Sequence, residues 1–89
     1  MKNEQVNSDI DAIVLTTTDF IPKKEIENIL GIIKISIHQK LNNKAIETEL
    51  KKKAYKMNAD AIIGIQFHQR EGFVDDFYTG TAVKLKDKP

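Results

Sequence analysis

The sequence predicts an α+β domain of element order β-β-α-β-β, with one antiparallel four-stranded sheet and one helix on one face. Two observations predict this class. Four short segments are rich in isoleucine, valine and threonine, which favour strands. One longer segment repeats its apolar residues at helical spacing. The 89 residues suit one domain, and we expect residues 1–10 to form a flexible polar tail and residues 11–89 the domain.

The first two strands are predicted from β-branched runs. AIVLTTT, residues 12–18, is followed by a turn through DFIPKK, which bounds a strand rather than a helix. ILGIIKISIH, residues 29–38, alternates over its second half and is the second strand. The apolar residues that share one face of it are Ile33, Ile35 and Ile37.

The helix is predicted within LNNKAIETELKKKAYKMNAD, residues 41–60. Asn42 or Asn43 can cap its start, because an asparagine side chain accepts a hydrogen bond from a free N–H of the first turn. Asn58 can end it in a left-handed conformation. Four apolar residues, spaced four, four and three positions apart, form one apolar stripe along the helix. The stripe consists of Ile46, Leu50, Ala54 and Met57.

Residues 61–69 and 77–86 are the last two strands, joined by the loop REGFVDD. The helix makes a crossover from the second strand to the third, so those two strands should run parallel. Hairpins should make the first strand antiparallel to the second and the fourth antiparallel to the third. An all-antiparallel ladder then requires the strand order 1-2-4-3.

Both faces of this sheet carry apolar or small residues, and a single helix covers only one face. The residues expected to face the helix are Ile63, Ile65 and Phe67, and those expected on the other face are Ile62, Gly64 and His68. We therefore expect a second copy of the chain to cover the other face.

Small residues in the last two strands, Gly64, Gly80 and Ala82, would allow a neighbouring backbone or a ligand to approach closely. Strand glycines also mark β-bulges, and this alternative stays open.

Composition excludes several classes of protein. Fourteen basic and thirteen acidic residues nearly cancel, which argues against a nucleic-acid binder, because phosphate neutralisation needs a concentrated basic surface. The chain has no cysteine, and hence no disulfide or cysteine-based zinc site. No segment approaches the roughly 20 apolar residues of a membrane span, and the N-terminus lacks the apolar centre of a signal peptide. We expect a soluble, cytoplasmic protein.

Four blocks, in this order, resemble the YbjQ-like family, which is often labelled heavy-metal-binding. They are IVLTTT at residues 13–18, KKEIENILGI at 23–32, NADAIIGI at 58–65 and TGTAVKL at 79–85. The resemblance implies a small α+β subunit with a dodecin-like sheet and helix that assembles as a ring, commonly a pentamer. One segment departs from the family. Only ISIHQKLNN stands where the family carries a longer segment with glycine and arginine, so the ring size stays open.

His38 and His68 are the only histidines and the candidate metal ligands. Both come at the ends of predicted strands, about 10 Å apart if the fourth strand separates them. Two nitrogens on one zinc must lie within about 4 Å of each other, so the two side chains would have to lean together across that strand, with strain. A ring would change this by placing His38 of one copy beside His68 of its neighbour. The alternative is that both are polar strand ends. Oxygen ligands near His68 could come from Glu71, Asp75 and Asp76, which are otherwise solvated loop carboxylates.

Other candidates have simpler explanations. Thr16, Thr17 and Thr18 have no histidine nearby in the sequence to act as a base, and threonine is a good strand former. The run of lysines at residues 51–53 could bind an anionic partner, but it suits a solvated helix face. No glycine-rich phosphate loop, HExxH, GxSxG or calcium-loop pattern occurs, so we expect no enzymatic activity.

These observations favour a non-enzymatic homo-oligomer that binds a metal ion or small ligand at subunit interfaces. The cofactor, if any, would be a divalent metal of unspecified identity. The alternative is a structural or protein-interaction module without a ligand.

Overall fold

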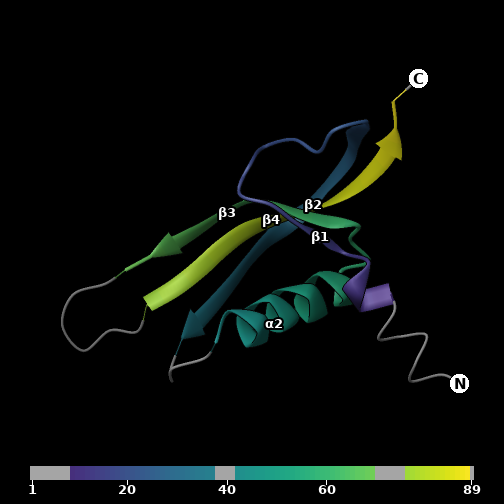
Figure 1. Cartoon of the computed structure of the whole chain (residues 1–89). Coiled ribbons are helices and arrows are strands. Elements are labelled where there is room, and N and C mark those ends of the chain that lie inside the picture. The colour runs from purple at the N-terminus through teal and green to yellow at the C-terminus, as the bar shows by residue number, and fades with distance from the viewer. Residues whose placement is uncertain (1–8, 38–41, 70–75, 89) are drawn as a thin grey trace, which may run out of the picture.

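The computed structural model describes residues 9–37, 42–69 and 76–88. One helical turn at residues 9–11 precedes a four-stranded sheet and one long helix, so the α+β class is confirmed. Residues 1–8 of the expected tail lie outside the described residues. The elements, labelled as in Figure 1, are β1 (Val14–Leu15), β2 (Lys24–Ile37), α2 (Asn43–Lys56), β3 (Ala61–His68) and β4 (Asp76–Asp87).

The strand order is β1-β3-β4-β2, and the sheet is mixed. β4 lies between β2 and β3 and is antiparallel to both, as predicted. β1 pairs in parallel with β3 instead of lying beside β2. The predicted order 1-2-4-3 and the all-antiparallel ladder are therefore wrong.

The error arises from the connection between β1 and β2, which is too long for a tight hairpin. β1 itself has two residues, and the chain after it continues along β3. Thr16 N donates to Ile62 O at 3.1 Å, and Gly64 N donates to Thr18 O at 2.9 Å. The chain then crosses the end of the sheet to start β2 at the opposite edge (Figure 1).

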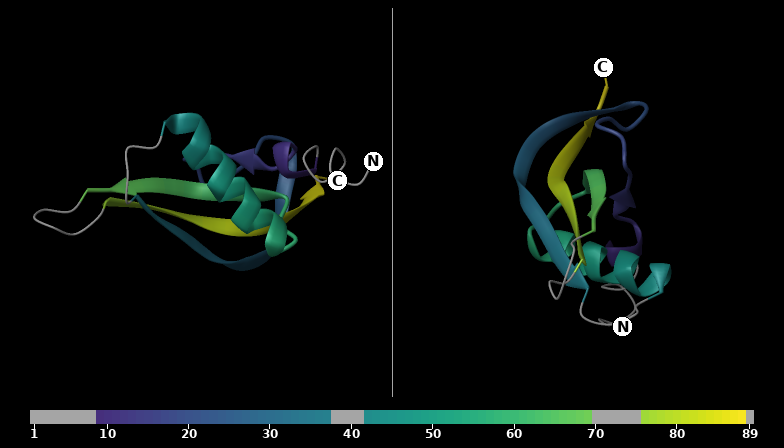
Figure 2. Two further views of the ribbon diagram at one scale, coloured as in Figure 1. Left: turned by 90° about the horizontal axis from the view of Figure 1, so that it is seen from below. Right: turned by 90° about the vertical axis from the view of Figure 1, so that its left-hand side faces the viewer.

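β2 starts at Lys24, five residues before the predicted start at Ile29. Its pairing with β4 shifts between Ile26 and Asn28 and again between Ile29 and Gly31. Each shift inserts an extra residue and bends the strand, and the β2–β4 ribbon curves strongly in the right-hand view of Figure 2. The two bulges break the two-residue alternation, which is why this half of β2 is hard to identify in the sequence.

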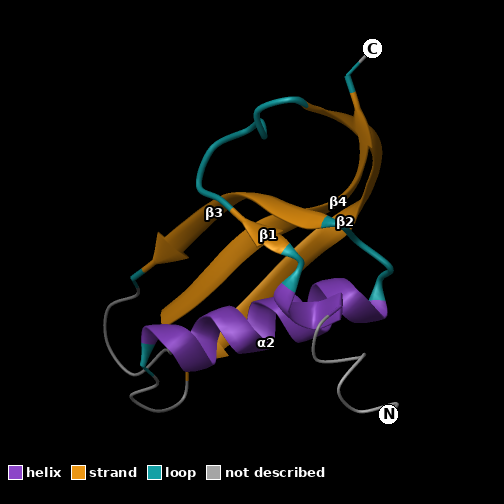
Figure 3. Ribbon diagram, turned by 45° about the vertical axis from the view of Figure 1, so that its right-hand side comes forward, coloured by secondary structure: helices purple, strands orange, loops and turns teal. Residues whose placement is uncertain are grey.

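The long helix begins and ends where the sequence predicts. The Asn42 side chain accepts a 2.7 Å hydrogen bond from Ala45 N, and Asn58 takes a left-handed conformation with φ of 61° just after the C-cap. α2 lies across one face of the sheet (Figure 3). Within the described residues, no helix is long and apolar enough to span a bilayer.

The main core lies between α2 and the sheet. The buried residues of this α2-side core include Ile33, Ile35, Ile46, Leu50, Ala54, Ile62 and Ala82. A second, smaller cluster lies on the other face, where Ile21 and Leu85 pack against Ala61, Ile63 and Val83. The connection before β2 thus covers part of the face that we expected a second copy to cover.

The faces predicted for β3 are wrong at two positions, because Ile62 faces α2 and Ile63 faces away. Gly64 explains the change. Its φ is +60°, and the pairing with β4 is irregular between Ile63 and Gln66. This left-handed residue resets the alternation, so Ile65 packs against the α2-side core as predicted.

The expected role of small residues at an oligomer contact also changes. Gly80 and Ala82 are buried, and Ala82 belongs to the α2-side core. A Cβ at Gly80 would meet Ile62 Cγ2 at 2.4 Å. These small residues make room for side chains of their own chain, and Gly64 marks a bulge.

Candidate functional site

His68, the last residue of β3, lies in a stack of side chains on the face away from α2. Its ring lies parallel to the ring of Phe77, with an interplanar angle of 10° and 4.5 Å between centroids. The Lys34 Nζ is 4.5 Å from the centre of the Phe77 ring. This is the face away from α2, because the next residue, Tyr78, packs against the α2-side core. The sheet therefore holds one imidazole in a fixed orientation at its rim.

One nitrogen of His68 already has a partner, because Nε2 lies 2.9 Å from Thr79 Oγ1. When Nε2 carries the proton, it donates to Thr79, and Nδ1 keeps a free lone pair. An imidazole that is oriented by a hydrogen bond at one nitrogen is the usual form of a histidine metal ligand. This arrangement provides one nitrogen, His68 Nδ1, that can bind a metal ion.

The other predicted ligands are not brought to His68 in the described part of the chain. His38, Glu71 and Asp75 lie outside the described residues. Asp76 lies in β4 and pairs with Ile37 of β2. No group of three histidine, aspartate or glutamate side chains gathers at a metal-sized site within residues 9–37, 42–69 and 76–88.

The threonines after β1 bond to one another. Thr16 Oγ1 lies 2.8 Å from Thr18 Oγ1 and also accepts from Thr18 N at 3.1 Å. Thr18 Oγ1 donates to Phe20 O at 2.7 Å. These contacts fix a turn, and no histidine or carboxylate of the described residues bonds to these hydroxyls.

The lysine run of α2 spreads over the helix surface. Lys51 Nζ donates to Asp11 O at 3.3 Å, and Lys52 Nζ is 3.9 Å from Glu49. These contacts suit a solvated face better than a site for an anion.

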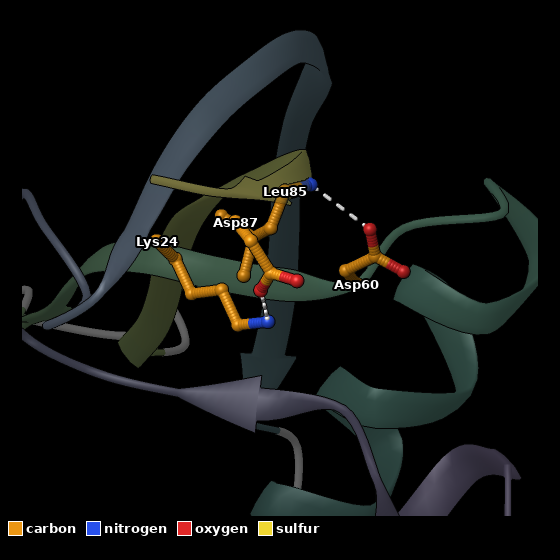
Figure 4. A network of polar contacts seen from close by, with 4 residues as sticks. All are labelled: Lys24, Asp60, Leu85 and Asp87. Carbon is orange, nitrogen blue, oxygen red and sulfur yellow. Dashed lines mark hydrogen bonds and ion pairs between the residues drawn. The ribbon is translucent and has the colours of Figure 1, made fainter. Parts of the chain in front are cut away.

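A group of polar contacts lies at the end of the sheet opposite to His68 (Figure 4). Lys24 and Asp87, at the ends of β2 and β4, form a hydrogen-bonded ion pair. This bond and the lysine charge lower the pKa of Asp87. Asp60 accepts from Leu85 N at 2.9 Å and lies 3.6 Å from Lys84 Nζ. The network joins structural elements, and sequence reasoning did not single it out.

Large apolar side chains are exposed at both edges of the sheet. The β2-edge group is defined as Ile26, Ile29 and Ile32; Ile29 is 70% exposed and Ile32 is 78% exposed. The opposite-edge group is defined as Val14, Phe20 and Phe67; Phe67 is 50% exposed. Lone exposed apolar residues are common, but groups of them mark contact surfaces.

Comparisons with known proteins inform the fold only. No protein-family model matches the chain, and no curated protein matches it. A crystal structure of a protein of unknown function from Pediococcus pentosaceus ATCC 25745, which belongs to the DUF74 family, is similar with a TM-score of 0.54. The two share 18% identity over 83% of this chain and 98% of that chain. DUF74 is the YbjQ-like family, so the neighbour's fold agrees with the resemblance seen in the sequence.

Proposed function

We propose that this chain is a non-enzymatic binding protein that works as an assembly of its own copies, with a metal ion or other small ligand held where copies meet. The observation that carries the proposal is the pair of exposed apolar groups at opposite edges of one sheet. An edge strand with exposed apolar residues is a template for pairing, and proteins normally cover or blunt it.

The two groups differ, which favours head-to-tail contact. One group lies on β2 and the other on β1, β3 and the segment that joins β1 to β2, so each copy has two distinct surfaces. Contact between the β2-edge group of one copy and the opposite-edge group of the next is heterologous, and such contacts close into a ring when the rotation allows it. Burying an isoleucine side chain contributes roughly 1.5–3 kcal/mol. A ring, with five copies as the family resemblance suggests, would cover both groups in every copy.

The same arrangement would supply the ligands that His68 lacks. β2 and β3 run in the same direction, so β2 ends at Ile37 at the same end of the sheet as His68. Within one copy, β4 separates these strand ends by about two strand spacings, or roughly 10 Å. In a head-to-tail contact the β2 edge of one copy would meet the β3 edge of the next. His38, which follows Ile37 in the sequence, would then approach the neighbour's His68.

Assembly is tested with two charge substitutions, Ile32→Lys and Phe67→Lys, one in each group. Light scattering at micromolar concentration should give an oligomer mass for the wild type and a monomer mass for each variant. An equimolar mixture of the two variants should give dimers, because one intact contact can still form between them. Circular dichroism of each variant checks that the fold survives.

The control is Asn28→Lys, which adds the same charge to the exposed surface of β2 without removing an apolar side chain. It should assemble like the wild type. A monomeric wild type would contradict assembly itself, whereas an unchanged mass for Phe67→Lys would contradict head-to-tail contact through this edge. An assembled protein that binds no ligand would instead match a structural or protein-interaction module.

A further inference from the structure

A hollow of about 480 Å³ opens between the N-terminal half of α2 and the strands that it covers. Its apolar walls include Leu15, Ile46, Leu50 and Ile65, and Ile46 and Leu50 are buried in the α2-side core. The volume is within the roughly 300–1,000 Å³ of small-molecule sites, which are largely apolar with a few polar groups. All of its lining residues belong to one copy, and one of them, Tyr78, contacts Phe67 of the opposite-edge group, with 5.0 Å between the ring centroids.

The rim of the hollow carries polar groups from two elements. α2 contributes Asn43 and Glu47, which lie four residues apart on one face of the helix, and the segment after β1 contributes Thr17. The Tyr78 ring also lines the hollow. Within the described residues, none of these four side chains takes part in a hydrogen bond or an ion pair, so their polar atoms are available to a ligand.

The charge of the lining decides which ligands fit. Glu47 is the charged side chain among the lining residues, and no lysine, arginine or histidine is among them. Glu47 is in no ion pair with any described residue. The lining therefore attracts a cationic head group and repels an anionic one. The aromatic ring of Tyr78 adds a face that also favours a cation.

We propose that this hollow is a binding site for a small amphipathic amine, whose apolar body lies against Leu50 and Ile65 and whose ammonium group meets Glu47. An ammonium group is a donor of three hydrogen bonds, and the side-chain oxygens of Asn43 and Thr17 can accept from it. A carboxylate ligand of the same shape would place its charge beside Glu47 and would find no cation in the lining.

Three probes with the same aromatic body and different head charges test this site: 2-phenylethylamine, 2-phenylethanol and phenylacetate. Each is titrated into the full chain at millimolar concentration and followed by amide and methyl NMR shifts. The amine should bind most tightly, with shifts centred on Leu50, Ile65 and Tyr78. Because Glu47 is exposed, its charge should favour the amine over the alcohol by roughly two- to fivefold in Kd.

Two variants and a control complete the experiment. Glu47→Gln should reduce the affinity for the amine to that for the alcohol, whereas Glu49→Gln, the same change at a residue of α2 outside the lining, should leave it unchanged. Thr17→Phe should fill the hollow and weaken all three probes. Equal binding of amine and carboxylate, or shifts that avoid Leu50 and Ile65, would overturn the proposal. The proposal would also be overturned if the NMR shifts of the lining residues changed on dilution of the protein but with none of the probes. A second copy of the chain would then be the occupant of the hollow.

Discussion

Gly80 of β4 leaves the space that the side chain of Ile62 on β3 occupies. A Cβ at position 80 would lie 2.4 Å from Ile62 Cγ2 and 3.2 Å from Ile65 Cγ1. Both Gly80 and Ile62 are buried. The Ile62 side chain therefore cannot move into solvent to make room for a methyl group at position 80. The lack of a side chain at position 80 therefore sets how closely Ile62 packs under α2.

We expect Gly80→Ala to destabilise the fold by about 1–3 kcal/mol, the usual cost of inserting an extra methyl group into a packed core. Urea unfolding gives the free energy of unfolding of each variant. Ile62→Ala alone should cost about 2–5 kcal/mol, but Gly80→Ala should cost less in that background because Cγ2 is gone. Ile62→Val retains both γ-carbons, including the one equivalent to Cγ2, and should give no such relief. Additive effects in the Ala double mutant would contradict the predicted clash.

The sequence predicts the elements better than it predicts their faces and order. The helix is read correctly because capping by Asn42 and the stripe of Ile46, Leu50 and Ala54 are local features. The faces of β3 depend on the φ of Gly64, and a strand glycine has the same sequence signature with or without a bulge. The position of β1 depends on whether its connection turns back or crosses over, and that is decided by long-range pairing with β3.

In the candidate sites, too, the local features can be predicted from the sequence and the long-range contacts cannot. That His68 ends β3 is visible in the sequence, but its stack with Phe77 and its hydrogen bond to Thr79 come from strand pairing. The hollow beside α2 was not predicted. Glu47 and Asn43 look like ordinary residues of a helix surface in the sequence, and the space beside them forms only when α2 packs over Leu15, Ile65 and Tyr78.

The Lys24–Asp87 pair gives a pH-dependent prediction. The hydrogen bond from Lys24 lowers the pKa of Asp87 in the folded state, so the folded chain binds this proton less readily than the unfolded chain. The stabilisation is therefore present above the ordinary aspartate pKa and is lost as the pH falls through the lowered value. Lys24→Met should return the pKa of Asp87 to its ordinary range, as followed by the carboxyl carbon NMR shift. An unchanged titration in that variant would show that Lys24 is not the cause, and high salt should weaken the effect in the wild type.

Metal binding at His68 predicts a rise in melting temperature with Zn²⁺, Cu²⁺ or Ni²⁺, because a ligand that binds only the folded state stabilises it by mass action. At a free metal concentration 100 times the Kd, the gain is about 2.7 kcal/mol, and each 1 kcal/mol raises the melting temperature by roughly 4–8 °C for a domain of this size. His68→Ala should abolish the rise, and so should His38→Ala if a neighbour's histidine completes the site. EDTA should reverse it in the wild type.

The assembly variants separate the source of the remaining ligands. If His38 of one copy and His68 of the next hold the metal together, the monomeric Ile32→Lys chain retains both histidines but should lose the metal-dependent rise. The Asn28→Lys control should keep it. A full rise in the monomeric variant would mean that one chain supplies every protein ligand, including residues outside the described ranges. No rise in the wild type with any of the three metals would remove the metal from the proposed function, and the assembly would then hold another ligand or none.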